Sequence, residues 1–141
     1  MTKPSWLFWV VAVFALLWGA YGVFDYWATT TNFQPYLKAF PADLLEWMLG
    51  FPTWRNMVWL VGVASGMLAA LLLALRMKLA APLFLLSLLS IIVGLIVHDL
   101  AMANGLNMFR PLDFIMIGVL IVVQTLLWRY SARAAKAGVL R

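Results

Sequence analysis

Four long apolar runs constrain this chain of 141 residues more than any other feature of its sequence. Three of the runs carry no charged side chain, and the fourth contains one acid, Asp113, near its start. A helix that crosses the hydrocarbon core of a bilayer needs about 20 mostly apolar residues, and in hydrocarbon its backbone must satisfy its hydrogen bonds internally. We therefore predict an all-α membrane protein, a single domain of residues 1–141 built as a four-transmembrane-helix bundle. The predicted spans, which extend the runs to flanking polar residues, are 6–26, 55–75, 79–102 and 111–130.

The composition supports a membrane protein and excludes several other classes. Hydrophobic residues make up 66% of the chain and charged residues 11%, whereas a soluble domain averages about 45–50% and about 25%. A chain this short could not bury so much apolar surface in water, which excludes a soluble domain and intrinsic disorder. There is no Cys and only one His, His98, so disulfides, thiol chemistry and a two-His metal site within one chain are excluded. We expect no metal and no other cofactor.

The basic residues are distributed unevenly between the two sides of the predicted bundle. Because cytoplasmic loops carry the excess of Lys and Arg, this distribution predicts that both termini are cytoplasmic. It also accounts for the net charge of +5 without a nucleic-acid partner, and we expect none. We expect the basic segment 129–141 to lie on the anionic cytoplasmic leaflet. On the side of the termini are Lys3, Arg76, Lys78, Arg129, Arg133, Lys136 and Arg141, and on the opposite side, with or near all five acids, are Lys38, Arg55 and Arg110.

The longest segment between two predicted spans, residues 28–53, contains an amphipathic pattern. From Tyr36 to Phe51, apolar side chains recur at three- and four-residue steps, with Pro41 interrupting the phase. This spacing predicts a short amphipathic helix, at about residues 41–49, that lies in the outer interface or covers the end of the bundle. A mobile lid over a cavity is the functional alternative.

Small residues recur at four-residue spacing in the predicted spans. The second span has Gly62, Gly66 and Ala70, and the first and third carry similar pairs. Small residues let helices approach closely in lipid, so we expect the first three helices to pack tightly. The fourth, whose only glycine is Gly118, is expected to face the lipid more, and its Gln124 amide to bond to another helix. The same small-residue spacing is compatible with a homodimer interface.

Polar and ionisable residues lie near the outer end of every predicted span. Ionisable groups at this depth are costly unless they are paired or hydrated, and a bidentate Arg–carboxylate pair is a favourable geometry. The first and third spans end with an Asp, and the second and fourth begin with an Arg. This faint twofold repeat would place two Asp–Arg pairs in equivalent positions. The candidate binding cluster is Asp25, Tyr26, Arg55, Asn56, His98, Asp99, Arg110 and Asp113.

Two interpretations of this cluster remain open from the sequence. In the first, ion pairs form a structural clasp that ties the helix ends together. In the second, the cluster lines a small outward-facing pocket, in which arginines bind an anionic or hydroxyl-rich ligand and His98, beside an acid, titrates near neutral pH. Met102, four residues after His98, would suit Cu(I), but no repeated Met or His spacing supports a copper site.

Two short motifs accompany this arrangement of spans. The first span ends with Gly-Val-Phe-Asp-Tyr at residues 22–26, and the amphipathic segment is followed by Phe-Pro-Thr-Trp at residues 51–54. With these features the chain resembles, over most of its length, the small four-helix bacterial inner-membrane proteins that automatic naming often describes as sugar transporters. It is similar to the DoxX-like proteins only in its number of spans. The resemblance implies a place in the bacterial inner membrane and a role in transport, and a transporter with so few helices implies an oligomer.

The sequence leaves three functional hypotheses. The first, which we favour, is a non-enzymatic membrane protein that binds or transports a small solute or lipid through the outer polar cluster. The second is an accessory or scaffold subunit that packs against a larger membrane complex. The third is a small membrane enzyme that uses Asp and His98 for acid–base chemistry, although the sequence has no recognised catalytic motif. The expected partners are the lipid bilayer, a homo-oligomer or larger complex, and a small-molecule ligand.

Overall fold

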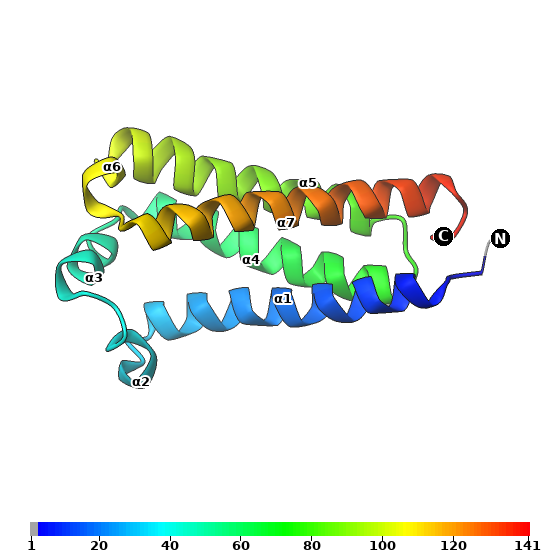
Figure 1. Cartoon of the computed structure of the whole chain (residues 1–141), viewed down its shortest axis with the longest axis horizontal. Helices are drawn as coiled ribbons and strands as arrows, with labels where there is room; N and C mark the ends of the chain where they lie inside the picture. Colours follow the sequence, from blue (N-terminus) through cyan, green and yellow to red (C-terminus); the bar gives the residue numbers. More distant parts are fainter. Residues whose placement is uncertain (1–2) are drawn as a thin grey trace.

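The computed structural model describes residues 3–141, and all regular structure within this range is helical (Figure 1). Four segments are long and apolar enough to cross a membrane, which confirms the predicted four-helix membrane bundle. The first and last described residues lie at one end of the bundle, the terminal end, and three short helices lie at the other, the distal end. The elements are α1 (Trp6–Thr30), α2 (Gln34–Leu37), α3 (Ala42–Leu49), α4 (Thr53–Ala74), α5 (Ala80–Ile91), the π-helix η1 (Ile92–Met102) that continues α5, α6 (Gly105–Met108) and α7 (Pro111–Lys136).

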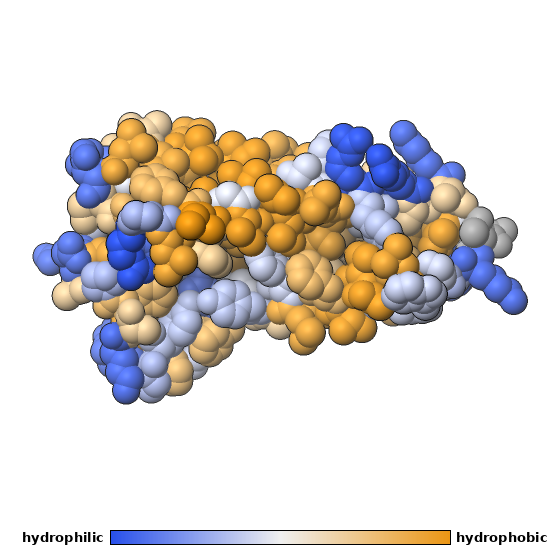
Figure 2. All heavy atoms as spheres, viewed as in Figure 1, coloured by the Kyte–Doolittle hydropathy of each residue, from blue (hydrophilic) through white to orange (hydrophobic). Residues whose placement is uncertain are grey.

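The outer surface between the two ends is apolar. In Figure 2, hydrophobic residues cover the middle of the molecule and hydrophilic residues gather towards both ends. Large side chains such as Leu17 and Leu126 are 68% and 62% exposed. Apolar surface of this extent is unfavourable in water but matches the hydrocarbon core of a bilayer. The chain is therefore a multi-pass membrane protein.

Residues at the helix starts explain where the long helices begin. Pro52 is the N-cap of α4, and Pro111 is the first residue of α7, where the missing proline N–H costs little. The Ser5 hydroxyl caps α1 by accepting a hydrogen bond from the Phe8 amide at 3.4 Å. The predicted starts of the spans consequently lie within two residues of the observed ones.

Two helices extend farther than predicted. α1 continues to Thr30, where the hydroxyls of Thr30 and Thr31 donate to backbone carbonyls of the preceding turn and so satisfy these side chains locally. α7 continues to Lys136, with Arg133 and Lys136 in its last turn, where cations interact favourably with the helix dipole. Hydrophobicity marks the lipid-facing part of a helix and not its full length, so the predicted ends came too early.

The last residues of the chain fold back onto the turn between α4 and α5. The backbone N–H of Arg141 donates to the Arg76 carbonyl, and the Lys78 N–H donates to the Arg141 carbonyl, both at 2.7 Å. Leu140 is 1% exposed. The basic segment 129–141 is therefore helical in its first part and packed against the bundle in its last part. Its contact with an anionic leaflet stays a prediction.

Small residues hold α4 and α5 close together. A Cβ on Gly62 would lie 3.1 Å from the Ser90 Cβ, and one on Gly66 would lie 2.9 Å from the Ser87 hydroxyl oxygen. The Ser87 hydroxyl donates to the Gly62 carbonyl at 2.7 Å. These contacts confirm the expected close packing of the second and third spans. α7 has the smallest buried share of the four spans, as expected of the helix that faces the lipid most.

A hydrogen-bonded group crosses the middle of the bundle. The Gln124 amide N–H donates to the Ser87 hydroxyl at 2.6 Å, and the Trp18 indole N–H donates to the Gln124 amide oxygen at 3.1 Å. These bonds connect α7 to α5 and α1, and they confirm the predicted interhelical bond of Gln124. Because such bonds contribute only about 0.6 kcal/mol on average within a membrane, they align the helices more than they stabilise them.

Gly66→Ala tests the close approach of α4 and α5. The added methyl group would meet the Ser87 hydroxyl. This hydroxyl is already held in place by its hydrogen bonds with Gly62 and Gln124. We expect the free energy of unfolding to fall by about 1–3 kcal/mol, measured by denaturant titration in micelles with tryptophan fluorescence. Gly118→Ala is the matched control, because its new methyl group would have no atom within 4 Å. Equal stability of the two variants would contradict the close contact.

Candidate functional site

The distal end of the bundle contains a buried ion pair between Arg55 and Asp99. Arg55 lies in the first turn of α4, and Asp99 lies in η1. The guanidinium donates two hydrogen bonds to the carboxylate, Nε to Oδ1 at 3.0 Å and Nη2 to Oδ2 at 2.6 Å. The two side chains are only 7% and 1% exposed. Because a buried charge is costly without a partner, this bidentate pair holds α4 against η1.

The π-helical form of η1 explains how two adjacent side chains both face the interior. The bond from the Ala103 N–H to the His98 carbonyl, at 2.8 Å, spans five residues. A π-helix has a wider turn than an α-helix, so neighbouring residues are separated by a smaller angle around its axis. His98 and Asp99 are both buried, and His98 Nδ1 lies 2.6 Å from Asp99 Oδ1. Met102 is 66% exposed, so it does not share the surroundings of His98.

Aromatic rings enclose the ion pair. The His98 ring meets Phe51 and Trp54 edge-on, with centroid distances of 4.9 and 5.0 Å. The guanidinium carbon of Arg55 lies 5.0 Å from the centroid of Phe51 and 5.4 Å from that of Trp59, within cation–π range. These rings keep water from the charges and thereby strengthen the attraction between them.

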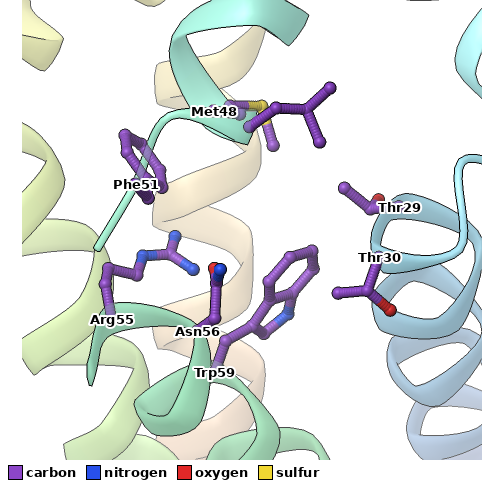
Figure 3. A pocket seen from close by; sticks show the side chains of 8 residues that line it. Thr29, Thr30, Met48, Phe51, Arg55, Asn56 and Trp59 are labelled. Carbon is purple, nitrogen blue, oxygen red and sulfur yellow. The ribbon is translucent and has the colours of Figure 1, made fainter. Parts of the chain in front are cut away.

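A cleft of about 210 Å³ lies beside the ion pair (Figure 3). Arg55 and Asn56 extend into it from α4, next to the Trp59 ring, and two threonines of α1 face them from the opposite side. Residues at the end of α3 and just after it complete the wall. The lining residues are Thr29, Thr30, Met48, Leu49, Phe51, Arg55, Asn56 and Trp59.

Several polar groups of this cleft have no partner among residues 3–141. Asp99 occupies Nε and Nη2 of the Arg55 guanidinium, and Nη1 forms no hydrogen bond to any described residue. The same holds for the side-chain amide of Asn56 and for the hydroxyl of Thr29, both of which line the cleft. The cleft therefore offers guanidinium N–H donors, an amide and a hydroxyl next to an apolar and aromatic wall.

Asp25 and Tyr36 connect α1 to α2 near the cleft. The Tyr36 hydroxyl donates to Asp25 Oδ1 at 2.5 Å, and Arg55 is close enough to interact electrostatically with Asp25. Burial, together with the hydrogen bond to Asp25, raises the pKa of the Tyr36 hydroxyl well above its usual value. The Tyr26 ring packs edge-on against Trp59 at a centroid distance of 5.0 Å, so it supports one wall of the cleft.

Arg110 and Asp113 form a separate pair at the start of α7. Asp113 accepts hydrogen bonds from Arg110 Nε and Nη2, each at 3.0 Å, and from the Arg110 backbone N–H at 2.9 Å. This is a capping box within one helix, and the hydrogen bond to the Asp113 carboxylate raises the pKa of Arg110. The Arg110 side chain is 40% exposed, so the pair belongs to the surface of the distal end.

The eight predicted site residues form three groups rather than one cluster. The predicted twofold repeat of Asp–Arg pairs is wrong, since Asp99 of the third span bonds to Arg55 of the second. Arg110 bonds instead to Asp113 of its own helix, because a capping box needs no contact between helices. The groups are Arg55, Asn56, His98 and Asp99 at the ion pair, Asp25 and Tyr26 on α1 near the cleft, and Arg110 and Asp113 at the start of α7.

Sequence analysis missed the residues that complete the cleft. Trp59 lies four residues after Arg55 and therefore on the same face of the helix, a spacing that would have indicated it. Thr29 and Thr30 lie beyond the predicted end of the first span at residue 26, and they reach the cleft because α1 extends beyond its apolar run. No spacing in the sequence would have indicated that α1 and α4 meet at these positions.

The predicted amphipathic helix at 41–49 is confirmed as α3, for which Pro41 is the N-cap. The Trp47 indole N–H donates to the Ala103 carbonyl at 2.9 Å, which ties α3 to the end of η1. α3 therefore covers part of the distal end, and its residues Met48 and Leu49 contribute to the cleft.

No family model, no curated protein and no solved structure matches this chain. The class of protein is therefore defined by the chain's own fold. Its four apolar helices make it a multi-pass membrane protein with a buried ion pair and a polar cleft at one end. The resemblance to the four-helix inner-membrane proteins stays a prediction.

Asp99→Asn and Asp113→Asn compare two carboxylates that each bind an arginine. Without the Asp99 charge, the Arg55 guanidinium is buried with no ion-pair partner, so we expect the free energy of unfolding to fall by about 3–5 kcal/mol. For the less buried Asp113 pair we expect a clearly smaller loss. Denaturant titrations of both variants in the same detergent measure the difference. Equal losses would mean that burial does not distinguish the two pairs.

Tyr36→Phe tests the hydrogen bond between α1 and α2 through its pH dependence. The folded protein holds the Tyr36 proton more tightly than the unfolded chain, whose tyrosines titrate near pH 10. The contribution of Tyr36 to stability is therefore present below about pH 10 and is lost as the pH rises further. We expect wild-type stability to fall more steeply than that of Tyr36→Phe above about pH 10, measured by thermal unfolding across that range. Parallel curves would contradict the raised pKa.

Proposed function

We propose that this membrane protein binds a small, neutral, hydroxyl-rich solute in the cleft between α1, α3 and α4. The observation that carries the proposal is the hydrogen bonding of the Arg55 guanidinium. Asp99 holds its guanidinium in one orientation, while Nη1 has no hydrogen-bond partner among residues 3–141 and the side chain borders the cleft. Hydrogen bonds from a charged N–H donor are strong, so an acceptor oxygen from a solute would bind favourably there.

The chemistry of the cleft favours hydroxyl groups over a full negative charge. Asp99 already balances the charge of Arg55, and Asp25 lies within electrostatic reach of it. Asn56 both donates and accepts hydrogen bonds, so it suits a hydroxyl, which does the same. Trp59 supplies an apolar surface for the carbon skeleton. The volume of about 210 Å³ is below the roughly 300–1,000 Å³ of drug-sized sites, which favours a small solute.

The proposed orientation places this cleft on the outer side of a bacterial inner membrane. Seven of the ten basic residues of the chain belong to the terminal end, and the positive-inside rule assigns that end to the cytoplasm. The bacterial location rests on the resemblance to the four-helix inner-membrane proteins alone. In this orientation both chain ends are cytoplasmic, and the cleft would sample solutes outside the cytoplasm.

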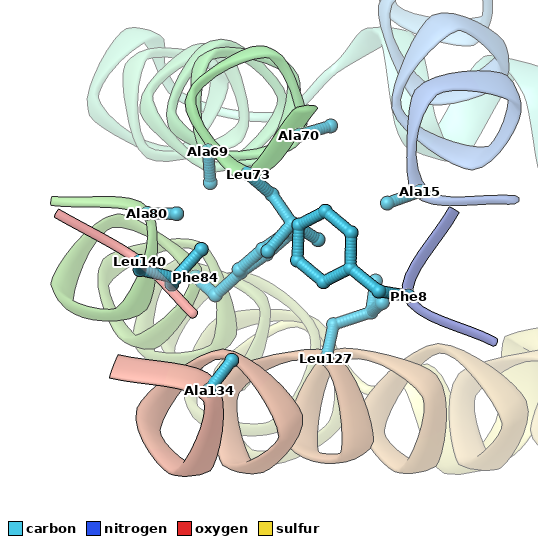
Figure 4. Packing of buried hydrophobic residues seen from close by; sticks show 10 residues of the cluster. All are labelled: Phe8, Ala15, Ala69, Ala70, Leu73, Ala80, Phe84, Leu127, Ala134 and Leu140. Atoms are coloured by element: carbon cyan, nitrogen blue, oxygen red, sulfur yellow. The ribbon is translucent and has the colours of Figure 1, made fainter. Parts of the chain in front are cut away.

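The interior of the bundle favours binding over free conduction. The hydrogen bonds among Trp18, Gln124 and Ser87 cross the bundle at its middle. Transport through a single chain would require the helices to separate, so a transporting form would be an oligomer. Packing also fills the interior at the terminal end, where four large buried side chains meet (Figure 4): Phe8, Leu73, Phe84 and Leu127.

Asn56→Leu tests solute binding without breaking the ion pair. The Asn56 amide has no partner among residues 3–141, so we expect the variant to fold normally and lose binding. The probes are D-glucose and glycerol as neutral hydroxyl-rich solutes, with L-lactate as the anionic comparison. A solute that binds only the folded state raises the unfolding temperature, so thermal unfolding in detergent measures binding. Asn107→Leu is the control, since Asn107 is exposed at the same end and bonds only to Asn104.

We expect a neutral probe to raise the unfolding temperature of the wild type and of Asn107→Leu but not of Asn56→Leu. If L-lactate is the only probe that stabilises the wild type, the ligand is an anion and the proposed neutral ligand class is wrong. If no probe stabilises the wild type, and native mass spectrometry finds a bare monomer, the solute-binding proposal fails and the accessory-subunit hypothesis takes its place.

A further inference from the structure

A second cleft, of about 410 Å³, lies at the terminal end of the bundle. It is formed by the start of α1, the end of α7 and the tail that folds back after α7. Its lining combines two basic side chains and two hydroxyl-bearing ones with an apolar remainder. The lining residues are Lys3, Ser5, Phe8, Tyr130, Arg133, Ala134, Ala137 and Val139.

The two cations of this cleft are not neutralised within the described part of the chain. Lys3 and Arg133 are exposed, and neither belongs to an ion pair formed by residues 3–141. The acids of the chain belong to the distal end, in or next to α3, η1 and the adjoining ends of α1 and α7. An anion in the cleft would therefore be attracted by both cations without competition from an acidic side chain.

The surface that leads to the cleft fits a lipid better than a free anion. Leu126, Tyr130 and Arg133 follow one another at four- and three-residue steps, so they lie on one face of α7. Leu126 is 62% exposed, and apolar surface therefore extends from the middle of the bundle towards the basic cleft. On α1, Trp9 is 45% exposed four residues after Ser5. Acyl chains could lie along these faces while their headgroup occupies the cleft.

We infer that this cleft binds the phosphate of an anionic phospholipid headgroup. Lys3 and Arg133 supply the charge, and the Tyr130 hydroxyl supplies a hydrogen bond. The Ser5 hydroxyl oxygen accepts from the Phe8 amide, which leaves its own proton for a phosphate oxygen. Basic pockets between transmembrane helices are the physical basis of headgroup recognition. The inference concerns the opposite end of the bundle from the solute cleft and does not depend on it.

The test compares two double variants that remove the same charge from the same end of the protein. Lys3→Gln/Arg133→Gln removes both cations of the cleft. Arg129→Gln/Lys136→Gln removes two exposed cations of α7 that do not line it. Each full-length protein is delipidated in detergent and titrated with phosphatidylglycerol, phosphatidylcholine or inorganic phosphate, and bound molecules are counted by native mass spectrometry. Lys3→Arg/Arg133→Lys keeps the charge and tests whether a change at these positions is harmful in itself.

We expect the wild type to bind phosphatidylglycerol at least about tenfold more tightly than phosphatidylcholine, given the contribution of each basic residue near an anionic headgroup. Lys3→Gln/Arg133→Gln should lose this preference, while the control and the charge-keeping variant retain it. If the Arg129→Gln/Lys136→Gln control loses the preference equally, the preference reflects general attraction between the basic end and anionic lipid, and the inference is overturned. If inorganic phosphate binds as tightly as phosphatidylglycerol, the inference that a lipid occupies the cleft is wrong.

Discussion

Neither Arg55 nor Asp99 could remain buried at the distal end without the other. Their two hydrogen bonds, of 3.0 and 2.6 Å, lie inside a shell of aromatic rings, where an unpaired charge would be strongly destabilising. The rest of the distal end depends on this pair. The wide turn of η1 brings Asp99 and His98 inward together, and the Trp47 bond to the end of η1 holds α3 over the site.

The structural clasp and the binding pocket are not exclusive alternatives for Arg55. Two nitrogens of its guanidinium bind Asp99, and the third is left without a partner among residues 3–141 where the side chain borders the cleft. A group held this way is already ordered before a ligand arrives, which lowers the entropic cost of binding. Its position on a packed helix, next to Asn56 and Trp59, gives it the rigidity that a binding site needs.

The two ends of the bundle have different electrostatics. At the distal end, Arg55 and Arg110 are matched by carboxylates. At the terminal end, the described residues include Lys3 and Arg133 beside a cleft that contains no acid. Between the ends, the apolar surface and the hydrogen bonds of Gln124 separate the two regions. This asymmetry is the basis for the proposed orientation in a membrane and for the different class of ligand that we propose for each end.

The apolar runs determined the four spans, because in hydrocarbon each helix must satisfy its own backbone, and the residues that flank the runs marked where the spans start. The sequence also predicted three further features: the close approach at Gly62, the helix at 41–49 and the bond of Gln124 to another helix. Each of them depends on residue size, spacing or polarity within one segment. Only the tertiary structure decided which charges pair between different helices. Asp99 reaches Arg55 because η1 is π-helical and α4 lies against it, and such distances between segments far apart in the chain leave no period in the sequence.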